Sequence, residues 1–167
     1  MIDVDVVLVT PIGTLGVAHH KEYVDRVRFL DPTSLVPFSV PQEGFLKKVE
    51  EWFLCYFSHS YPIDPLPLLL NNKGTPYQRK VWRALLNIPY GETITYGQLA
   101  KELNSSAQAI GMACKFNPLP ILIPCHRVVA QNGLGGYFGE TSGKKIDVKA
   151  WLINHEKSAL KIKAGAV

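Results

Sequence analysis

A cysteine and a histidine are adjacent in the stretch "ILIPCHRVVA", residues 121–130. A cysteine among isoleucine, leucine and valine is most often a small buried hydrophobic residue. The neighbours of Cys125 favour a second interpretation, because His126 and Arg127 are rarely buried without partners. A nearby cation also lowers the pKa of a thiol and increases its thiolate fraction. The stretch therefore predicts a nucleophilic thiolate at Cys125.

The base that would activate this cysteine poses a geometric problem. Adjacent side chains point to opposite faces of a strand, and they diverge by about 100° on a helix. We therefore expect a water molecule between Cys125 and His126, and a third group that orients the imidazole ring. Glu156 is the candidate for this third group, and its alternative interpretation is a solvated surface charge.

The other cysteines carry weaker signals. Cys55 lies in the aromatic stretch "EEWFLCYF", and Cys114 has no adjacent base, so neither is assigned a chemical role. An odd number of cysteines without a CxxC pair argues against a disulfide framework or a cysteine zinc site, and it fits a reducing cytoplasm. The glycine-rich stretch 132–145 lacks the spacing of a phosphate loop, and it forms either a pocket wall or an ordinary surface loop.

The composition is that of a globular protein. The chain has 167 residues, of which 47% are hydrophobic and 19% charged, with a net charge of +4. The charge permits a polyanionic partner without requiring one. No apolar run reaches the roughly 18 residues of a membrane span. The first ten residues hold two aspartates and no basic residue, so they do not read as a signal peptide.

The first part of the chain predicts strands followed by a helix. Four apolar residues recur at the two-residue period of a strand: Ile2, Val4, Val6 and Leu8. A turn at Pro11 and Gly13 leads to further strands in "TLGVAHH" and "EYVDRVRFL". A helix is expected after Pro41, with a face formed by Phe45, Val49, Trp52 and Tyr56. The proline-rich "YPIDPLPLLLNNKG" then connects two domains, 1–73 and 74–167.

Helices dominate the second part. In "TPYQRKVW", Thr75 is the expected N-cap, Pro76 suits the first helical position, and Gln78 completes a capping box. Near the end, "DVKAWLINHEKS" predicts a helix capped by Asp147. One side of that helix carries Val148, Trp151, Leu152 and His155.

Two short helices between these segments suggest a helix-turn-helix motif. The first breaks at Asn104, and the second begins with a capping box of Ser105 and Gln108 and runs to about Phe116. Gly111 inside the second helix costs about 1 kcal/mol relative to alanine. A close approach of another backbone would explain it. That backbone belongs either to a neighbouring helix, which is the commoner case, or to a nucleic acid.

Four stretches occur in one order: "GTPYQRKVW", "GETITYGQLA", "NPLPILIPCHRVV" and "DVKAWLINHE". Together they resemble the O6-alkylguanine-DNA alkyltransferases over residues 74–156. The resemblance implies an α+β fold, with a small N-terminal domain carrying an antiparallel sheet and a mainly helical C-terminal domain. It implies a monomeric DNA repair protein without a cofactor or metal. Such a protein transfers the alkyl group of O6-alkylguanine, and of O4-alkylthymine, irreversibly to its own cysteine.

The resemblance also implies roles for individual residues. Cys125 would accept the alkyl group, with His126 acting through a water molecule and Glu156 orienting His126. Tyr96 would protonate the guanine, and Asn117 would hold the turn that leads to the active segment.

The substrate would be a base flipped out of double-stranded DNA, because the reacting atom lies inside the duplex. The resemblance implies that the alkyl pocket is lined by Tyr137, Phe138 and Val128. It implies that the helix-turn-helix binds the minor groove. The residues assigned to DNA binding are Ser106, Ala107, Gln108, Gly111, Lys115 and Arg127.

Three departures from the family pattern stand out. Gln108 takes the place of an arginine that fills the gap left by the flipped base in many relatives. Phe138 stands where some relatives have serine, and four or five extra residues follow it. The N-terminal part lacks the zinc-binding cysteines of some relatives, which is why no metal is predicted.

Three other functions compete with repair. A lesion sensor that binds alkylated DNA without repairing it would lack the cysteine, which this chain retains. A helix-turn-helix regulator would use the "PCHR" segment for structure alone. A cysteine hydrolase would need an oxyanion-hole motif, and none is evident in the sequence.

Overall fold

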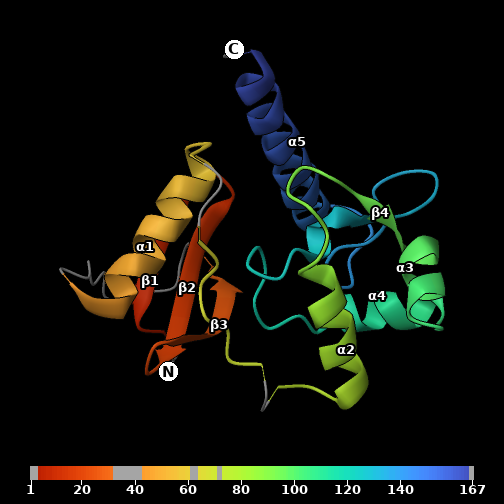
Figure 1. Ribbon diagram of the computed structural model, residues 1–167, viewed down its shortest axis with the longest axis horizontal. Helices are drawn as coiled ribbons and strands as arrows, with labels where there is room; N and C mark the ends of the chain where they lie inside the picture. The colour runs from red at the N-terminus through yellow and green to blue at the C-terminus, as the bar shows by residue number, and fades with distance from the viewer. Residues whose placement is uncertain (1–3, 32–42, 61–63, 71–72, 166–167) are drawn as a thin grey trace. The chain divides into compact units, whose positions relative to one another are not determined.

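The computed structural model describes residues 4–31, 43–60, 64–70 and 73–165 (Figure 1). The chain divides into two compact units, Met1–Lys73 and Gly74–Val167. Ile2 and Pro41, which contributed to the predicted strand and helix, lie outside the described residues.

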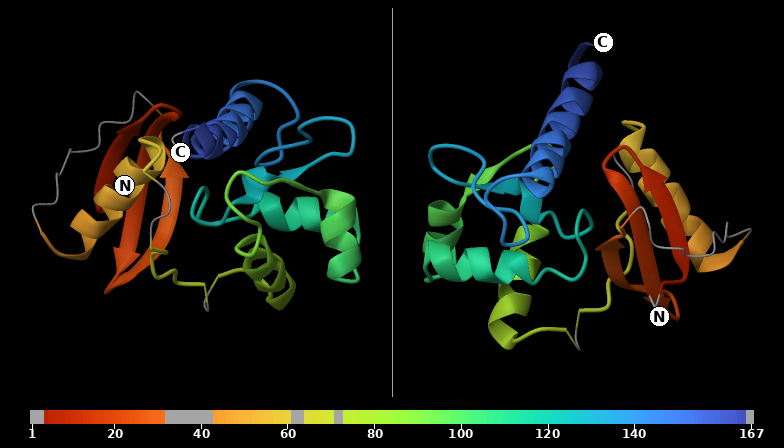
Figure 2. Two further views of the ribbon diagram at one scale, coloured as in Figure 1. Left: turned by 45° about the horizontal axis from the view of Figure 1, so that its top comes forward. Right: turned by 180° about the vertical axis from the view of Figure 1, so that it is seen from behind.

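Unit 1 is a three-stranded antiparallel sheet with one helix. Its strands are β1 (Val6–Thr10), β2 (Gly13–His20) and β3 (Tyr23–Phe29), in that spatial order. The helix α1 (Gly44–Phe57) lies against one face of the sheet (Figure 2). The most deeply buried side chains described in the unit are Val6, Leu15, Val17, Val24, Val49, Phe53 and Tyr56. The α+β prediction is confirmed.

The proline-rich connection is more ordered than its sequence suggested. The N–H of Val24 donates to the carbonyl of Pro67 over 2.8 Å, and the N–H of Leu69 donates to the carbonyl of Val24 over 2.9 Å. These bonds attach the connection, in parallel, to the outer edge of β3. Pro67 contributes only its carbonyl, which is the one backbone bond that a proline can make at a sheet edge.

Unit 2 is mainly helical. Its elements in chain order are α2 (Pro76–Leu85), β4 (Ile94–Thr95), α3 (Tyr96–Glu102), α4 (Ala107–Lys115), the 3-10 turn η1 (Cys125–Arg127), β5 (Val128–Val129) and α5 (Lys144–Gly165). The short strands β4 and β5 pair in parallel. The turn η1, which holds the "CHR" motif, packs against both α2 and α5, while α4 packs against α2 and α3.

One of the two predicted capping boxes forms. Thr75 accepts from the N–H of Gln78 over 3.1 Å, and the Gln78 side chain accepts from the N–H of Thr75 over 2.8 Å. An equivalent box between Thr95 and Gln98, which the sequence reading missed, begins α3.

The predicted capping box between Ser105 and Gln108 is wrong by one residue. Ser106 is the N-cap of α4, and its hydroxyl accepts from the N–H of Ala109 over 3.2 Å. The Ser105 hydroxyl instead bonds the Tyr77 hydroxyl of α2 at 2.5 Å. This tertiary contact draws Ser105 away from the helix. Gln108 therefore has no capping role.

The last helix begins earlier than predicted. The carbonyl of Gly143 accepts from the N–H groups of Ile146 and Asp147, so the first turn forms three residues before Asp147. Asp147 lies within that first turn and is not the cap. The helix is also the longest in the described part of the chain, yet no helix there is long and apolar enough to cross a membrane.

Candidate active site

Cys125 is held in a sharply turned, buried segment. It opens η1 directly after Pro124, and its side chain is only 2% exposed. The approach is strained, because Ile121 adopts a left-handed φ of 73°, which is unfavourable for a β-branched residue. A 2.8 Å bond from the N–H of Ile123 to the carbonyl of Leu119 closes this turn.

Asn117 fixes the turn and also reaches the sulfur. Its side-chain oxygen accepts from the N–H of Leu119 over 3.0 Å. Its amide nitrogen donates to the carbonyl of Ile123 over 2.8 Å and to the sulfur of Cys125 over 3.1 Å. One buried side chain therefore ties the end of α4 to the cysteine.

Glu156 lies behind η1 as an acceptor for a cluster of donors. The ring of His126 meets it at 2.7 Å through Nε2, and both residues are almost completely buried. Arg127 donates to it through Nε at 2.9 Å and Nη2 at 3.0 Å, and the N–H of Gly91 donates at 2.9 Å. A carboxyl group surrounded by donors is ionised, and an ionised carboxylate can only accept. The proton in the His126–Glu156 bond therefore belongs to Nε2.

The charge states follow from these contacts. Burial, the largest influence, acts to raise the pKa of Glu156, but His126 and Arg127 outweigh it and lower that pKa. Burial lowers the pKa of His126, although Glu156 opposes the shift. The imidazole is consequently neutral at neutral pH. Its Nδ1 atom carries a lone pair, is buried, and has no hydrogen-bond partner among the described residues.

The resting form of Cys125 differs from the sequence-based prediction. Burial raises the pKa of its thiol to about 11, although the Asn117 hydrogen bond, the Lys149 charge and the Tyr137 hydroxyl all act to lower it. Cys125 is therefore a thiol at neutral pH, not a thiolate. Burial outweighs the cations that the sequence places nearby, so the proton must leave during the reaction.

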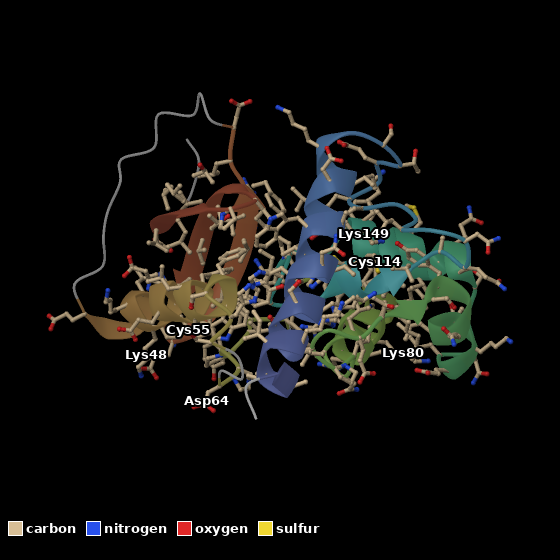
Figure 3. The ribbon with its side chains drawn as sticks, turned by 90° about the horizontal axis from the view of Figure 1, so that it is seen from above. Lys48, Cys55, Asp64, Lys80, Cys114 and Lys149 are labelled. Atoms are coloured by element: carbon tan, nitrogen blue, oxygen red, sulfur yellow. The ribbon has the colours of Figure 1, made fainter. Side chains whose placement is uncertain are left out.

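Lys149 is a site residue that the sequence reading missed. Its ammonium group donates to the carbonyls of Val128 and Gly136, at 2.6 and 2.8 Å, and lies 3.4 Å from the Tyr96 hydroxyl. Burial lowers its pKa to about 8. Figure 3 shows its position on α5 near Cys114. The available signal was its spacing, because a residue seven positions before Glu156 lies on the same helix face.

A cavity of about 290 Å³ opens in front of Cys125. The residues lining it include Tyr96, Gln108, Gly111, Met112, Cys114, Lys115, Gly136, Tyr137 and Phe138. The Tyr96 hydroxyl donates to the carbonyl of Gly136 across its wall, over 3.0 Å. Val128 was predicted to line the pocket, but it is completely buried and lies outside the lining. It supports the cavity through the carbonyl that holds Lys149.

One wall of the cavity is a tight turn. Tyr137 and Glu140 exchange two backbone hydrogen bonds, at 2.8 and 3.0 Å, around Phe138 and Gly139. Phe138 has a left-handed φ of 48°. Its ring packs edge-on against the ring of Tyr137, with 4.5 Å between the ring centres. The glycine-rich stretch 132–145 was expected to form either a pocket wall or an ordinary surface loop. For this turn the interpretation as a pocket wall is correct.

The outward face of α4 is open. Ser106, Ala107, Gln108 and Lys115 are exposed. A methyl group added at Gly111 would meet no heavy atom within 4 Å outside its own helix backbone. Packing against the described residues therefore does not explain this glycine.

Arg127 does not belong with the DNA contacts that were predicted. It is only 9% exposed. Besides its two bonds to Glu156, it donates through Nη1 to the carbonyl of Ile88 over 2.6 Å. A guanidinium engaged in this way is unavailable to a phosphate, so this prediction is wrong, and Arg127 instead stabilises the charge of Glu156.

Comparison with known proteins agrees with this geometry. Residues 76–158 match the family described as "6-O-methylguanine DNA methyltransferase, DNA binding domain". The constitutive methylated-DNA–protein-cysteine methyltransferase of Bacillus subtilis is 36% identical over 164 residues, which cover 92% of this chain and 95% of that protein. The corresponding protein of Methanosarcina acetivorans is 37% identical, over 89% of this chain and 95% of its own.

The fold agrees as well. A crystal structure of Mycobacterium tuberculosis OGT in complex with DNA superposes with a TM-score of 0.75 and 36% identity, over 92% of each chain. A Methanococcus jannaschii O6-methylguanine DNA methyltransferase superposes with a TM-score of 0.63 and 30% identity, over 90% of this chain and 92% of that one. The chain belongs to the methylated-DNA–protein-cysteine methyltransferase family.

Proposed function

We propose that this protein repairs DNA by moving the alkyl group of O6-alkylguanine to the sulfur of Cys125. The observation that carries the proposal is the position of that sulfur. It faces a cavity on one side, and the His126–Glu156 pair lies behind its segment. Family membership supports the same chemistry. O4-alkylthymine presents a similar alkyl–oxygen bond and is proposed as a second substrate.

The thiol loses its proton to His126 in this scheme. Nδ1 of His126 has no hydrogen-bond partner among the described residues, and a water molecule would carry the proton from Cys125 to it. Glu156 accepts the hydrogen bond from Nε2–H and stabilises the imidazolium that forms. The Asn117 amide remains as a donor to the sulfur as negative charge develops there.

Transfer then forms a carbon–sulfur bond and breaks the carbon–oxygen bond at guanine O6. The electron pair of the broken bond stays on the guanine, which needs a proton. Tyr96 is the donor at the cavity wall, and the ammonium group of Lys149 lies 3.4 Å from its hydroxyl and would offset the charge that develops on it. The thioether on Cys125 has no easy route back, so each molecule reacts once.

DNA would reach the site through α4. The target base must leave the duplex to enter a cavity of this kind. We propose that Ser106, Ala107, Gln108, Gly111 and Lys115 contact the minor groove, and that the protein acts as a monomer. A free thiol persists in a reducing compartment, which supports our proposal of a cytoplasmic location.

The decisive experiment incubates the protein with a duplex carrying one O6-methylguanine and then measures its intact mass. We expect a gain of one methyl group, mapped to Cys125, in stoichiometric amount. Cys125→Ala should abolish transfer while binding of the duplex persists, and Cys55→Ala is the matched control that should transfer normally. Binding without methylation of the wild type would favour the lesion sensor. A duplex with O4-methylthymine tests the second substrate.

A further inference from the structure

Two side chains of α4 form a ridge beside the cavity. Gln108 and Met112 both line the cavity that contains Cys125, and both also line a neighbouring hollow of about 410 Å³ on the other side. They are four residues apart, so they lie one above the other on the same face of the helix. The ridge thus borders the place where a base would enter.

The ridge is exposed and free to contact another molecule. Met112 is 49% exposed. Gln108 is exposed too, and it is not used as a helix cap because Ser106 fills that position. Gly111, next to Met112, faces open space, so nothing on the described surface blocks an approach to this side of α4.

No cation belongs to the ridge itself. Lys115 is the one basic residue within α4. The aliphatic part of the Lys115 side chain packs over Gly139. A methyl group added at Gly139 would lie 2.8 Å from Cε of Lys115. Its ammonium group lies 5.9 Å from the centre of the Phe116 ring. The ridge therefore offers an amide and a thioether.

A base that leaves the duplex opens a gap that has to be filled. Unstacking a base step costs a few kcal/mol, and minor-groove proteins offset this cost by inserting apolar side chains such as methionine. A methionine is long, unbranched and polarisable, which suits a gap of irregular shape.

We propose that Met112 is the wedge that occupies the space of the flipped nucleotide, while Gln108 hydrogen-bonds the base left without its partner. This inference rests on the proposed function, because it assumes that α4 faces the groove. In this proposal the gap left by the flipped nucleotide is filled by an apolar side chain, because filling that gap does not require a positive charge.

The test compares two substrates of the same thiol. Transfer from an O6-methylguanine duplex requires flipping, whereas transfer from free O6-benzylguanine does not. Met112→Ala should lower the ratio of the duplex rate constant to the free-base rate constant by about tenfold, since unstacking costs a few kcal/mol. Met112→Leu, which keeps the apolar volume, should restore most of the ratio. Leu54→Ala removes another exposed apolar side chain, from α1, and should leave the ratio unchanged.

A second measurement isolates the flipping step. In the Cys125→Ala background, a duplex with 2-aminopurine at the lesion position should brighten on binding, and Met112→Ala should reduce this rise. An unchanged rate ratio, or an undiminished rise in fluorescence, would overturn the wedge while leaving the repair proposal intact. A wild type that reacts with neither substrate would instead overturn the proposed function, and the wedge with it.

Discussion

The side-chain amide of Asn117 donates to the sulfur of Cys125 over 3.1 Å. The same amide donates to the carbonyl of Ile123, so its direction is fixed by the turn. A donor aimed at sulfur favours the thiolate over the thiol, and it acts to lower a thiol pKa that burial has raised. Asn117 therefore links the shape of the active segment to the reactivity of its cysteine.

Asn117→Ala should slow alkylation of Cys125 by iodoacetamide at pH 8 by roughly tenfold, because hydrogen bonds to charged groups contribute about 1.5–3 kcal/mol. Peptide mapping by mass spectrometry would follow each cysteine separately. Cys55 in unit 1 is the internal control for general unfolding, and Asn154→Ala on the exposed side of α5 is the matched variant. Faster alkylation of Cys125, with Cys55 unchanged, would contradict the proposed role.

Glu156→Gln should lower the free energy of unfolding by about 3–5 kcal/mol, the usual cost of breaking a buried ion pair. The amide would carry no charge for Arg127 and would turn a donor toward one of the groups that now donate to it. Urea titration measures the effect. Glu140→Gln is the control, since its 2.8 Å pair with Lys145 is about half exposed and should contribute little. If both variants lost the same free energy of unfolding, burial would not determine how much an ion pair contributes to stability.

The stability of the protein should rise between pH 8 and pH 9 because of Lys149. Its pKa is about 8 in the folded protein, below its ordinary 10.5. Between these values the unfolded chain binds a proton that the folded chain has lost, so unfolding becomes less favourable as pH increases. Cys125 lowers the stability as pH increases, because its pKa is raised from an ordinary 9.0 to about 11 in the folded protein. This opposite effect is confined to the pH range between those two values.

Lys149→Met should remove this rise. Urea midpoints measured across the pH window would show a sloping line for the wild type and a flatter line for the variant. Parallel lines for the two proteins would mean that the ammonium group keeps an ordinary pKa in the folded state.

Gly111→Ala should stabilise the protein and impair DNA binding. Alanine is favoured over glycine in a helix by up to about 1 kcal/mol, and the added methyl group meets no neighbour here. The same methyl group would keep α4 from a close approach to the groove. Thermal unfolding and fluorescence anisotropy with a labelled duplex measure the two effects. A more stable variant with undiminished affinity would show that DNA does not approach this position.

The local patterns of the sequence were sufficient for the type and order of most helices and strands, although not for every helix end. The capping box at Thr75 and the break at Asn104 depend on groups within a few residues of one another, and each strand of unit 1 follows from its own alternation of apolar residues. Side-chain hydrogen bonds and periodic apolar residues of this kind are visible in a linear chain. The stretch "PCHR" likewise identified the cysteine and the histidine, and together with three other stretches it indicated the family to which the chain belongs.

Only the tertiary structure decided the chemical state of the site. Arg127 meets Glu156 across 29 residues, and the hydroxyl of Tyr77 meets Ser105 across 28. No local pattern could show that the first pair buries an arginine or that the second shifts a helix cap. The protonated thiol of Cys125 and the lowered pKa of Lys149 have the same origin. Burial sets the cost of a charge, and burial exists only once distant segments have packed together.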